Sequence, residues 1–256
     1  MRRWATDIND LNGLAAAQVI LLAAMTLGAA YIRGLTGFGM AIILVPLLGI
    51  IVPPGEAVVI GILLQMLIGP VGLKVIYADA HRPSALAIAA FAVAATPVGI
   101  LLLKTTPPDI ARLMIAVIAI GAFILVLLPQ RGALRPGPKE TAATGVLSGI
   151  LTGFAAMPGP PVVPYYLRQP IPPTEARASM MLVFFATAIA GTVSAFALGI
   201  ADGRLFVLSL ILFPAVLAGN WLGGKSFGKV PAPLWRSFVA GLLGLAGLSA
   251  MIRLFT

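Results

Sequence analysis

The sequence consists mainly of apolar runs, and several are long enough for a helix to cross a bilayer, which takes about 20 residues. Of the 256 residues, 60% are hydrophobic and 10% are charged, whereas soluble domains carry roughly 25% charged residues. A chain in lipid has to pair its own backbone polar groups, so it spans as helices or as a closed barrel. The runs predict an all-α integral membrane protein with about 8–10 membrane segments. They cover residues 13–32, 40–52, 57–77, 84–103, 110–128, 141–157, 158–167, 176–200, 205–224 and 232–252. We expect the first run to be retained, because no clear small-residue cleavage site accompanies it.

One short pattern occurs twice. Leu-Thr-Gly-Phe at 35–38 precedes Pro46 and a Pro-Pro-x-Glu-Ala segment, and the same order returns from 151–154 through Pro164. Glycine and proline interrupt helices, and broken backbone is tolerated in lipid only where it is buried in protein or lines a cavity. Interruptions at corresponding positions of two halves indicate the binding site of a secondary transporter.

The duplication divides one membrane domain into an N-terminal repeat (1–128), a linker (129–140) and a C-terminal repeat (141–256). The number of crossings between the two copies is odd, so the copies should face opposite sides of the membrane. This predicts an inverted repeat whose broken or re-entrant helices meet near the midplane. As a helix, 158–167 would be about 15 Å long, half the hydrocarbon thickness. The sequence leaves open whether this segment and 35–52 span or re-enter.

The formal net charge is +9, but the cations lie mostly in short loops between apolar runs. Topology signals and anionic lipid headgroups explain them better than nucleic acid does, and we expect no nucleic-acid partner. More cations fall on the side of the linker, so the positive-inside rule predicts that 129–140 is cytoplasmic. That side is predicted to hold Lys74, Arg82, Arg131, Arg135, Lys139, Arg168, Arg177, Lys225, Lys229 and Arg236.

The sequence is poor in residues that carry catalysis. It contains no cysteine, and its one histidine, His81, lies in a polar loop where we expect it to be solvated. Disulfides and thiol chemistry are excluded, no Walker motif is present, and an intramembrane hydrolase would lack an activated nucleophile. We expect no enzyme activity, no catalytic residue, no metal and no cofactor.

The Gly-Phe-Gly element at 37–39, Pro46 in the following apolar run and the Pro-Pro at 53–54 before Ala57 resemble the sulfite exporter TauE/SafE family of bacterial permeases. The resemblance extends from about residue 14 to residue 253 and includes a looser second copy. In that copy Phe-Ala-Ala-Met-Pro-Gly-Pro-Pro at 154–161 replaces the glycine-rich run. The resemblance implies a transporter of small sulfur-containing or organic anions, such as sulfite and organosulfonates, in the bacterial inner (plasma) membrane.

Helix breaks at the two Thr-Gly-Phe elements would expose N–H groups and positive helix ends to an anion. The threonines would add hydroxyls, the glycines amides, and the phenylalanines apolar walls or gates. The alternative is close helix packing through small residues. The candidate substrate-binding residues are Arg33, Thr36, Gly37, Phe38, Gly39, Gln65, Thr152, Gly153, Phe154 and Gly159.

Two polar residues within the runs have alternative roles. Arg33 lies three residues before Thr36, where its guanidinium would hold a sulfonate or carboxylate by paired hydrogen bonds. It could instead extend to the interface or pair with an acid. Gln65 would line the cavity or bond to a neighbouring helix, and the same alternative applies to Asn220.

The duplicated prolines and glutamates are equally ambiguous. Pro46 and Pro164 are kinks, or gating positions that start half-helices ending at the cavity. Glu56 and Glu175 follow Pro-Pro pairs, where the helix dipole favours an acid in the first turn. The alternative is that they couple transport to a proton or a cation.

The sequence therefore predicts a secondary transporter of a small anion, working by alternating access around the two Leu-Thr-Gly-Phe elements. Its partners would be the anion, membrane lipid and a coupling proton or sodium ion. The alternatives are an anion channel and a non-transporting membrane scaffold or assembly subunit. The exact substrate, the direction of transport, the coupling ion and a homodimeric state stay open.

Overall fold

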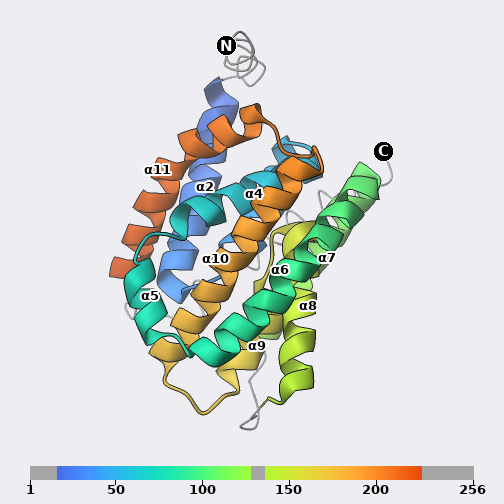
Figure 1. Ribbon diagram of the computed structural model, residues 1–256. Coiled ribbons are helices and arrows are strands. Elements are labelled where there is room, and N and C mark those ends of the chain that lie inside the picture. The colour runs from blue at the N-terminus through green and yellow to red at the C-terminus, as the bar shows by residue number, and fades with distance from the viewer. Residues whose placement is uncertain (1–15, 128–135, 227–256) are drawn as a thin grey trace.

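The structure of this chain is a computed structural model that describes residues 16–127 and 136–226. Within these ranges it contains helices and no strands, which confirms the predicted all-α class (Figure 1). The helices are α2 (Ala16–Thr36), α3 (Met40–Ile51), α4 (Pro54–Ile68), α5 (Leu73–Asp79), α6 (Arg82–Thr105), α7 (Pro108–Leu127), α8 (Pro138–Ala155), α9 (Gly159–Leu167), α10 (Pro173–Ala197) and α11 (Gly203–Lys225). The expected segment 232–252 lies outside the described residues, as do Arg131, Arg135, Lys229 and Arg236.

Five of the described helices are long and apolar enough to cross a membrane, namely α2, α6, α7, α10 and α11, and a sixth span results if α4 and α5 count as one. Large apolar side chains such as Ile20, Val117 and Val193 point outward on these helices and are 60% exposed or more. An apolar exterior of this kind suits a lipid environment. The chain is a multi-pass membrane protein.

The predicted single run at 57–77 is wrong. The chain breaks between α4 and α5, whose axes are bent by 83°. α4 ends at Ile68, Pro70 lacks a backbone N–H, and Gly72 adopts a positive φ of 76° at the N-cap of α5. The break could not be predicted from the apolar composition, because apolar residues lie on both sides of it.

Two short helices follow the duplicated pattern. α3 has 12 residues and α9 has nine, which correspond to about 18 Å and about 14 Å of helix. Neither length covers a hydrocarbon core of about 30 Å. Each short helix therefore covers only part of the hydrocarbon thickness.

The two halves of the chain exchange helix partners. α2 of the first half packs along α11 of the second, and α8 of the second half packs along α6 of the first. Glycines allow both approaches: a Cβ on Gly223 would overlap the carbonyl oxygen of Tyr31, and a Cβ on Gly149 would overlap that of Ala92. Small residues permit such close contact between membrane helices. Figure 1 shows α2 descending from the N-terminal end while α8 rises from the opposite edge.

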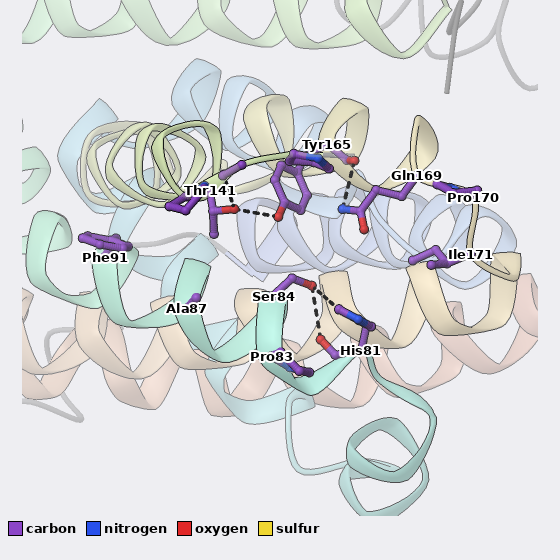
Figure 2. Close-up of a pocket in the computed structure, with 13 residues that line it drawn as sticks. His81, Pro83, Ser84, Ala87, Phe91, Thr141, Tyr165, Gln169, Pro170 and Ile171 are labelled. Carbon is purple, nitrogen blue, oxygen red and sulfur yellow. Dashed lines mark hydrogen bonds between the residues drawn. The ribbon is translucent and has the colours of Figure 1, made fainter. Parts of the chain in front are cut away.

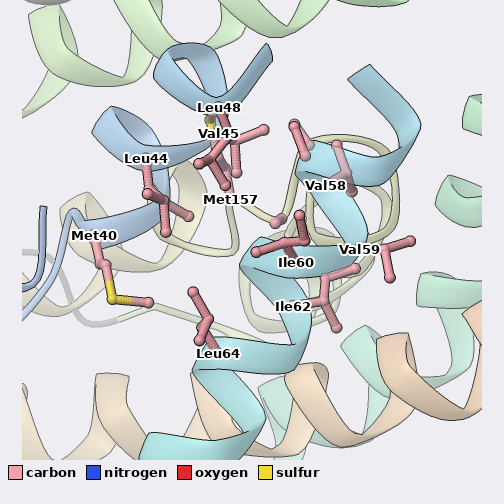
Figure 3. Close-up of a cluster of buried hydrophobic side chains, with 14 of the residues drawn as sticks. Met40, Leu44, Val45, Leu48, Val58, Val59, Ile60, Ile62, Leu64 and Met157 are labelled. Carbon is pink, nitrogen blue, oxygen red and sulfur yellow. The ribbon is translucent and has the colours of Figure 1, made fainter. Parts of the chain in front are cut away.

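The core between α3 and α4 is fully apolar. Leu44 and Leu48 of α3 face Ile60 and Leu64 of α4, and Met157 from the loop before α9 packs beside them (Figure 3). All five side chains are at most 1% exposed. This packing fixes the first short helix against α4 and brings the loop before the second short helix to the same place.

Candidate functional site

The first break lies between α2 and α3. Gly37 and Gly39 have φ values of 86° and 89°, in the left-handed region that residues with a Cβ rarely adopt. The hydroxyl of Thr36 lies 2.8 Å from the carbonyl oxygens of both Ile32 and Phe38. Because a hydroxyl has one proton, this threonine is engaged by the backbone of the break itself.

The second break lies later than the sequence predicts. Residues 151–154 form the last turn of α8, and the chain leaves the helix at Ala156, whose φ is 58°. The physical reason is Pro158, which has no N–H to continue the helix and disfavours the helical conformation in the residue before it. Ser148 donates a hydrogen bond of 3.0 Å to the carbonyl oxygen of Pro158, which ties the break back to α8.

The two breaks meet around one small cavity of about 30 Å³. The first break supplies the start of α3, the second supplies the start of α9, and α2, α4 and α10 supply one side chain each. One water molecule needs roughly 10–15 Å³, so the cavity has room for about two. We call it the central cavity. Its lining is Arg33, Phe38, Gly39, Met40, Ala41, Ile42, Gln65, Met157, Pro158, Gly159 and Phe184.

The main-chain donors of the cavity come chiefly from α3. The first turn of a helix has N–H groups without intrahelical partners, and no side chain caps the start of α3. Residues 39–42, which form this start, all line the cavity. α9 contributes less, because Pro160 and Pro161 cannot donate and Gly159 alone carries an N–H among its first three residues. Both helix N-termini place positive dipole ends at the cavity.

Arg33 and Gln65 connect the cavity to other helices. A guanidinium nitrogen of Arg33 donates a 3.0 Å hydrogen bond to the side-chain oxygen of Asn220 on α11. The amide nitrogen of Gln65 donates to the carbonyl oxygen of Ala156 at 2.9 Å and to that of Gly61 at 3.2 Å. Arg33 and Gln65 also line a second cavity of about 20 Å³ beside Phe184. The side chains of Arg33 and Gln65 therefore lie between the central cavity and this second cavity.

The cavity has a positive electrostatic character. Arg33 lines it, whereas none of the residues in its lining is an aspartate or a glutamate. Ion pairs in the described ranges join Arg112 to Asp109 at 2.9 Å and Arg204 to Glu56 at 2.6 Å, and neither involves a residue of the lining. A cation beside uncapped helix N–H groups, with no carboxylate in the lining, has the chemistry that suits an anion.

The sequence profile of the sulfite exporter TauE/SafE family matches residues 21–250. The chain belongs to this family. It is also 31% identical, over 173 residues, to a protein of Cupriavidus necator described as a probable sulfite/organosulfonate exporter TauE. That alignment covers 65% of this chain and 68% of the relative. No solved structure matches the chain significantly.

In this TauE/SafE family member, five of the ten candidate substrate-binding residues line the central cavity: Arg33, Phe38, Gly39, Gln65 and Gly159. Gly37 adjoins it at the first break. Thr152 is buried and donates to the carbonyl oxygen of Ser148 at 2.7 Å. A Cβ on Gly153 would overlap the carbonyl oxygen of Thr96, so this glycine lies in the contact between α8 and α6.

The remaining candidates lie away from the cavity lining. Pro46 and Pro164 are inside α3 and α9, and neither begins its helix. Phe154 is buried in the last turn of α8. Glu56 and Glu175 occupy the first turns of α4 and α10.

A larger cavity of about 560 Å³ opens between the starts of α6 and α8 and the end of α9 (Figure 2). His81 lines it from the loop before α6, is half-buried, and has its Nδ1 2.7 Å from the Ser84 hydroxyl. The Thr141 hydroxyl lies 2.9 Å from that of Tyr165. No lysine, arginine, aspartate or glutamate belongs to its described lining. It therefore lacks the charge that makes the central cavity suitable for an anion.

Sequence reasoning missed three residues near the breaks. Phe184 and Met157 belong to the lining but look like ordinary apolar residues in the sequence. Arg177 was assigned only to the cationic side, yet its side chain lies against Gly37: a Cβ there would be 2.6 Å from the Arg177 Nε. Nothing in the local sequence reveals this contact, because α10 and the first break are far apart along the chain.

Proposed function

We propose that this protein is a secondary transporter of small sulfur-containing anions, sulfite or organosulfonates, and that the anion binds in the central cavity. The observation that carries the proposal is the meeting of Arg33 with the uncapped start of α3 in a cavity whose described lining holds no acid. Membership of the TauE/SafE family and the name of the Cupriavidus necator relative support the substrate class. The same features give no support to an enzymatic role.

In this proposal the sulfonate or sulfite oxygens accept hydrogen bonds from the N–H groups at 39–42 and from the Arg33 guanidinium. A guanidinium offers two parallel donors, which match two oxygens of one anion. The N–H of Gly159 adds a donor from the other half of the chain. Phe38 and Phe184 form apolar walls that keep water away, which strengthens the charged interactions.

The way the two halves are built supports transport by alternating access. Both breaks line one cavity, the first helices of the halves run in opposite directions, and the halves exchange packing partners. These features support an inverted repeat in which one half moves against the other around the bound anion. A cavity of about 30 Å³ corresponds to a closed arrangement, and it must widen toward one side before a sulfonate enters. We place the linker 129–140 in the cytoplasm of a bacterial cell, with the chain in the inner membrane.

The test is counterflow in liposomes that contain the purified protein. Labelled sulfite is measured entering vesicles preloaded with unlabelled sulfite, sulfoacetate, taurine or acetate. We expect saturable exchange with at least one sulfur-containing anion. Exchange with none by a folded protein would refute the proposal, and an ohmic current without saturable exchange would favour a channel.

Arg33→Gln is the variant that tests the proposed contact between the guanidinium and the anion. Arg82→Gln is the control, since Arg82 is exposed and lies over the ring of Tyr77. Hydrogen bonds to charged groups contribute about 1.5–3 kcal/mol, so Arg33→Gln should lower exchange at subsaturating anion by about 10- to 100-fold. Arg82→Gln should stay within about twofold of the unaltered protein. Equal effects of the two substitutions would exclude a direct role for Arg33.

A further inference from the structure

A second arginine from the other half of the chain reaches the first break. Arg177 lies in the second turn of α10, and its side chain runs along Gly37. A Cβ on that glycine would lie 2.6 Å from the Nε, 3.0 Å from the Cδ and 3.1 Å from the Cγ of Arg177. The absence of a side chain at residue 37 therefore creates the space that this arginine occupies.

Arg177 is also close to Arg33. Gly37, against which the Arg177 side chain lies, donates its N–H to the carbonyl oxygen of Arg33 at 2.7 Å, so both arginines belong to the first break. In the described part of the chain, neither forms an ion pair, and Arg33 has the uncharged Asn220 as its partner. Two like charges at one break destabilise each other unless a counter-ion joins them.

We propose that Arg33 and Arg177 form a two-cation site that selects a divalent anion. This inference rests on the proposed transport function. One negative group of the substrate binds Arg33 and the start of α3, while the second negative charge is neutralised by Arg177. A dianionic sulfocarboxylate, or sulfite in its doubly charged form, fits this arrangement, whereas a monoanionic sulfonate leaves one cation uncompensated.

The position of Arg177 also links binding to conformation. α2 and α3 belong to the first half of the chain, and α10 belongs to the second. A dianion held by both arginines adds a charged link between the two halves, whereas a monoanion held by Arg33 is joined to the second half only through the N–H of Gly159. Binding of a dianion therefore favours the arrangement in which the halves are close, which is how a ligand shifts a conformational equilibrium.

The test compares two substrates that differ by one carboxylate, 3-sulfopropionate and propane-1-sulfonate, as inhibitors of sulfite counterflow. The readout is the ratio of their inhibition constants. We expect the unaltered protein to prefer the dianion, Arg177→Gln to reduce this preference by about tenfold, and Arg177→Lys to retain part of it. Lys139→Gln removes an exposed charge from the start of α8 and should leave the ratio unchanged.

The outcomes separate the two claims. Exchange that proceeds with the same ratio in Arg177→Gln and the unaltered protein would overturn the two-cation site and leave the transport function standing. An equal shift in Lys139→Gln would overturn it as well, because a general surface potential would then explain the preference. No exchange of any sulfur-containing anion by the unaltered protein would overturn the transport function and this inference together.

Discussion

Substitution of Gly153 by alanine tests whether this residue of the duplicated motif serves packing. A Cβ at residue 153 would overlap the carbonyl oxygen of Thr96 and would lie 2.5 Å from the backbone nitrogen of Ile100 and 2.8 Å from the carbonyl carbon of Gly99. All three are backbone atoms of α6, so no change of rotamer relieves the overlap. The helices α6 and α8 would have to move apart.

The magnitude follows from two opposing terms. Replacing a helical glycine by alanine gains about 1 kcal/mol of helix propensity, and overpacking a close contact costs about 1–3 kcal/mol. Since the obstructing atoms are backbone, the cost should lie near the upper end, and Gly153→Ala should destabilise the protein by about 1–2 kcal/mol. The matched control is Gly121→Ala in α7, where nothing lies within 4 Å of the added Cβ. The control should be neutral or more stable by up to about 1 kcal/mol.

The assay is unfolding of both variants by denaturant in mixed micelles, followed by helix content, with the free energies compared at a common denaturant concentration. We expect Gly153→Ala to unfold at a lower concentration than the unaltered protein and Gly121→Ala at the same or a higher one. If the two variants were equally stable, the close contact between α6 and α8 would be refuted. Gly153 would then be available for another role at the second copy.

Three further substitutions test individual contacts. Gln65→Leu removes the hydrogen-bond donor to the carbonyl oxygen of Ala156 at the second break and should lower the free energy of unfolding by about 1–3 kcal/mol in the same assay. Gln65→Glu at low pH should lose less, because a protonated carboxyl can still donate. Thr36→Val removes the hydroxyl that lies beside the Phe38 carbonyl and should cost about 1 kcal/mol, whereas Thr36→Ser should be near neutral; equal effects would contradict the role of the hydroxyl. Glu56→Gln removes a half-exposed ion pair with Arg204, so we expect a loss of at most about 1 kcal/mol and an unchanged response of counterflow to a pH gradient; loss of that response would favour the coupling role instead.

Much of the helical framework could be predicted from the sequence, because its signals are local. Apolar runs end at proline and glycine, and the Pro-Pro pair at 53–54 opens α4, with Pro53 as its N-cap and Pro54 as its first residue. The first break is also a local property, since Gly37 and Gly39 adopt conformations that few other residues can. The short second element at 158–167 matches α9, which begins at Gly159.

The features that the sequence could not reveal depend on tertiary contacts. The second break falls at Ala156, a residue with no preference for a positive φ, and the Gln65 amide bound to its carbonyl oxygen comes from α4. Arg177 counted as one cation among several until α10 placed it against Gly37. Periodicity and composition describe one segment at a time, so neither can reveal a contact between segments that are distant in the sequence.

The claim that an anion binds between the two breaks can be tested most directly by chemical protection of an introduced cysteine. The chain contains no natural cysteine, so Ala41→Cys would place a single thiol in the cavity lining, and Thr105→Cys would place one at the exposed end of α6 as a control. Labelling by a small maleimide is measured in proteoliposomes with and without sulfoacetate. We expect sulfoacetate to slow labelling of Ala41→Cys and to leave Thr105→Cys unaffected. Labelling of Ala41→Cys at the same rate in both conditions, in a protein that still exchanges sulfoacetate, would contradict it.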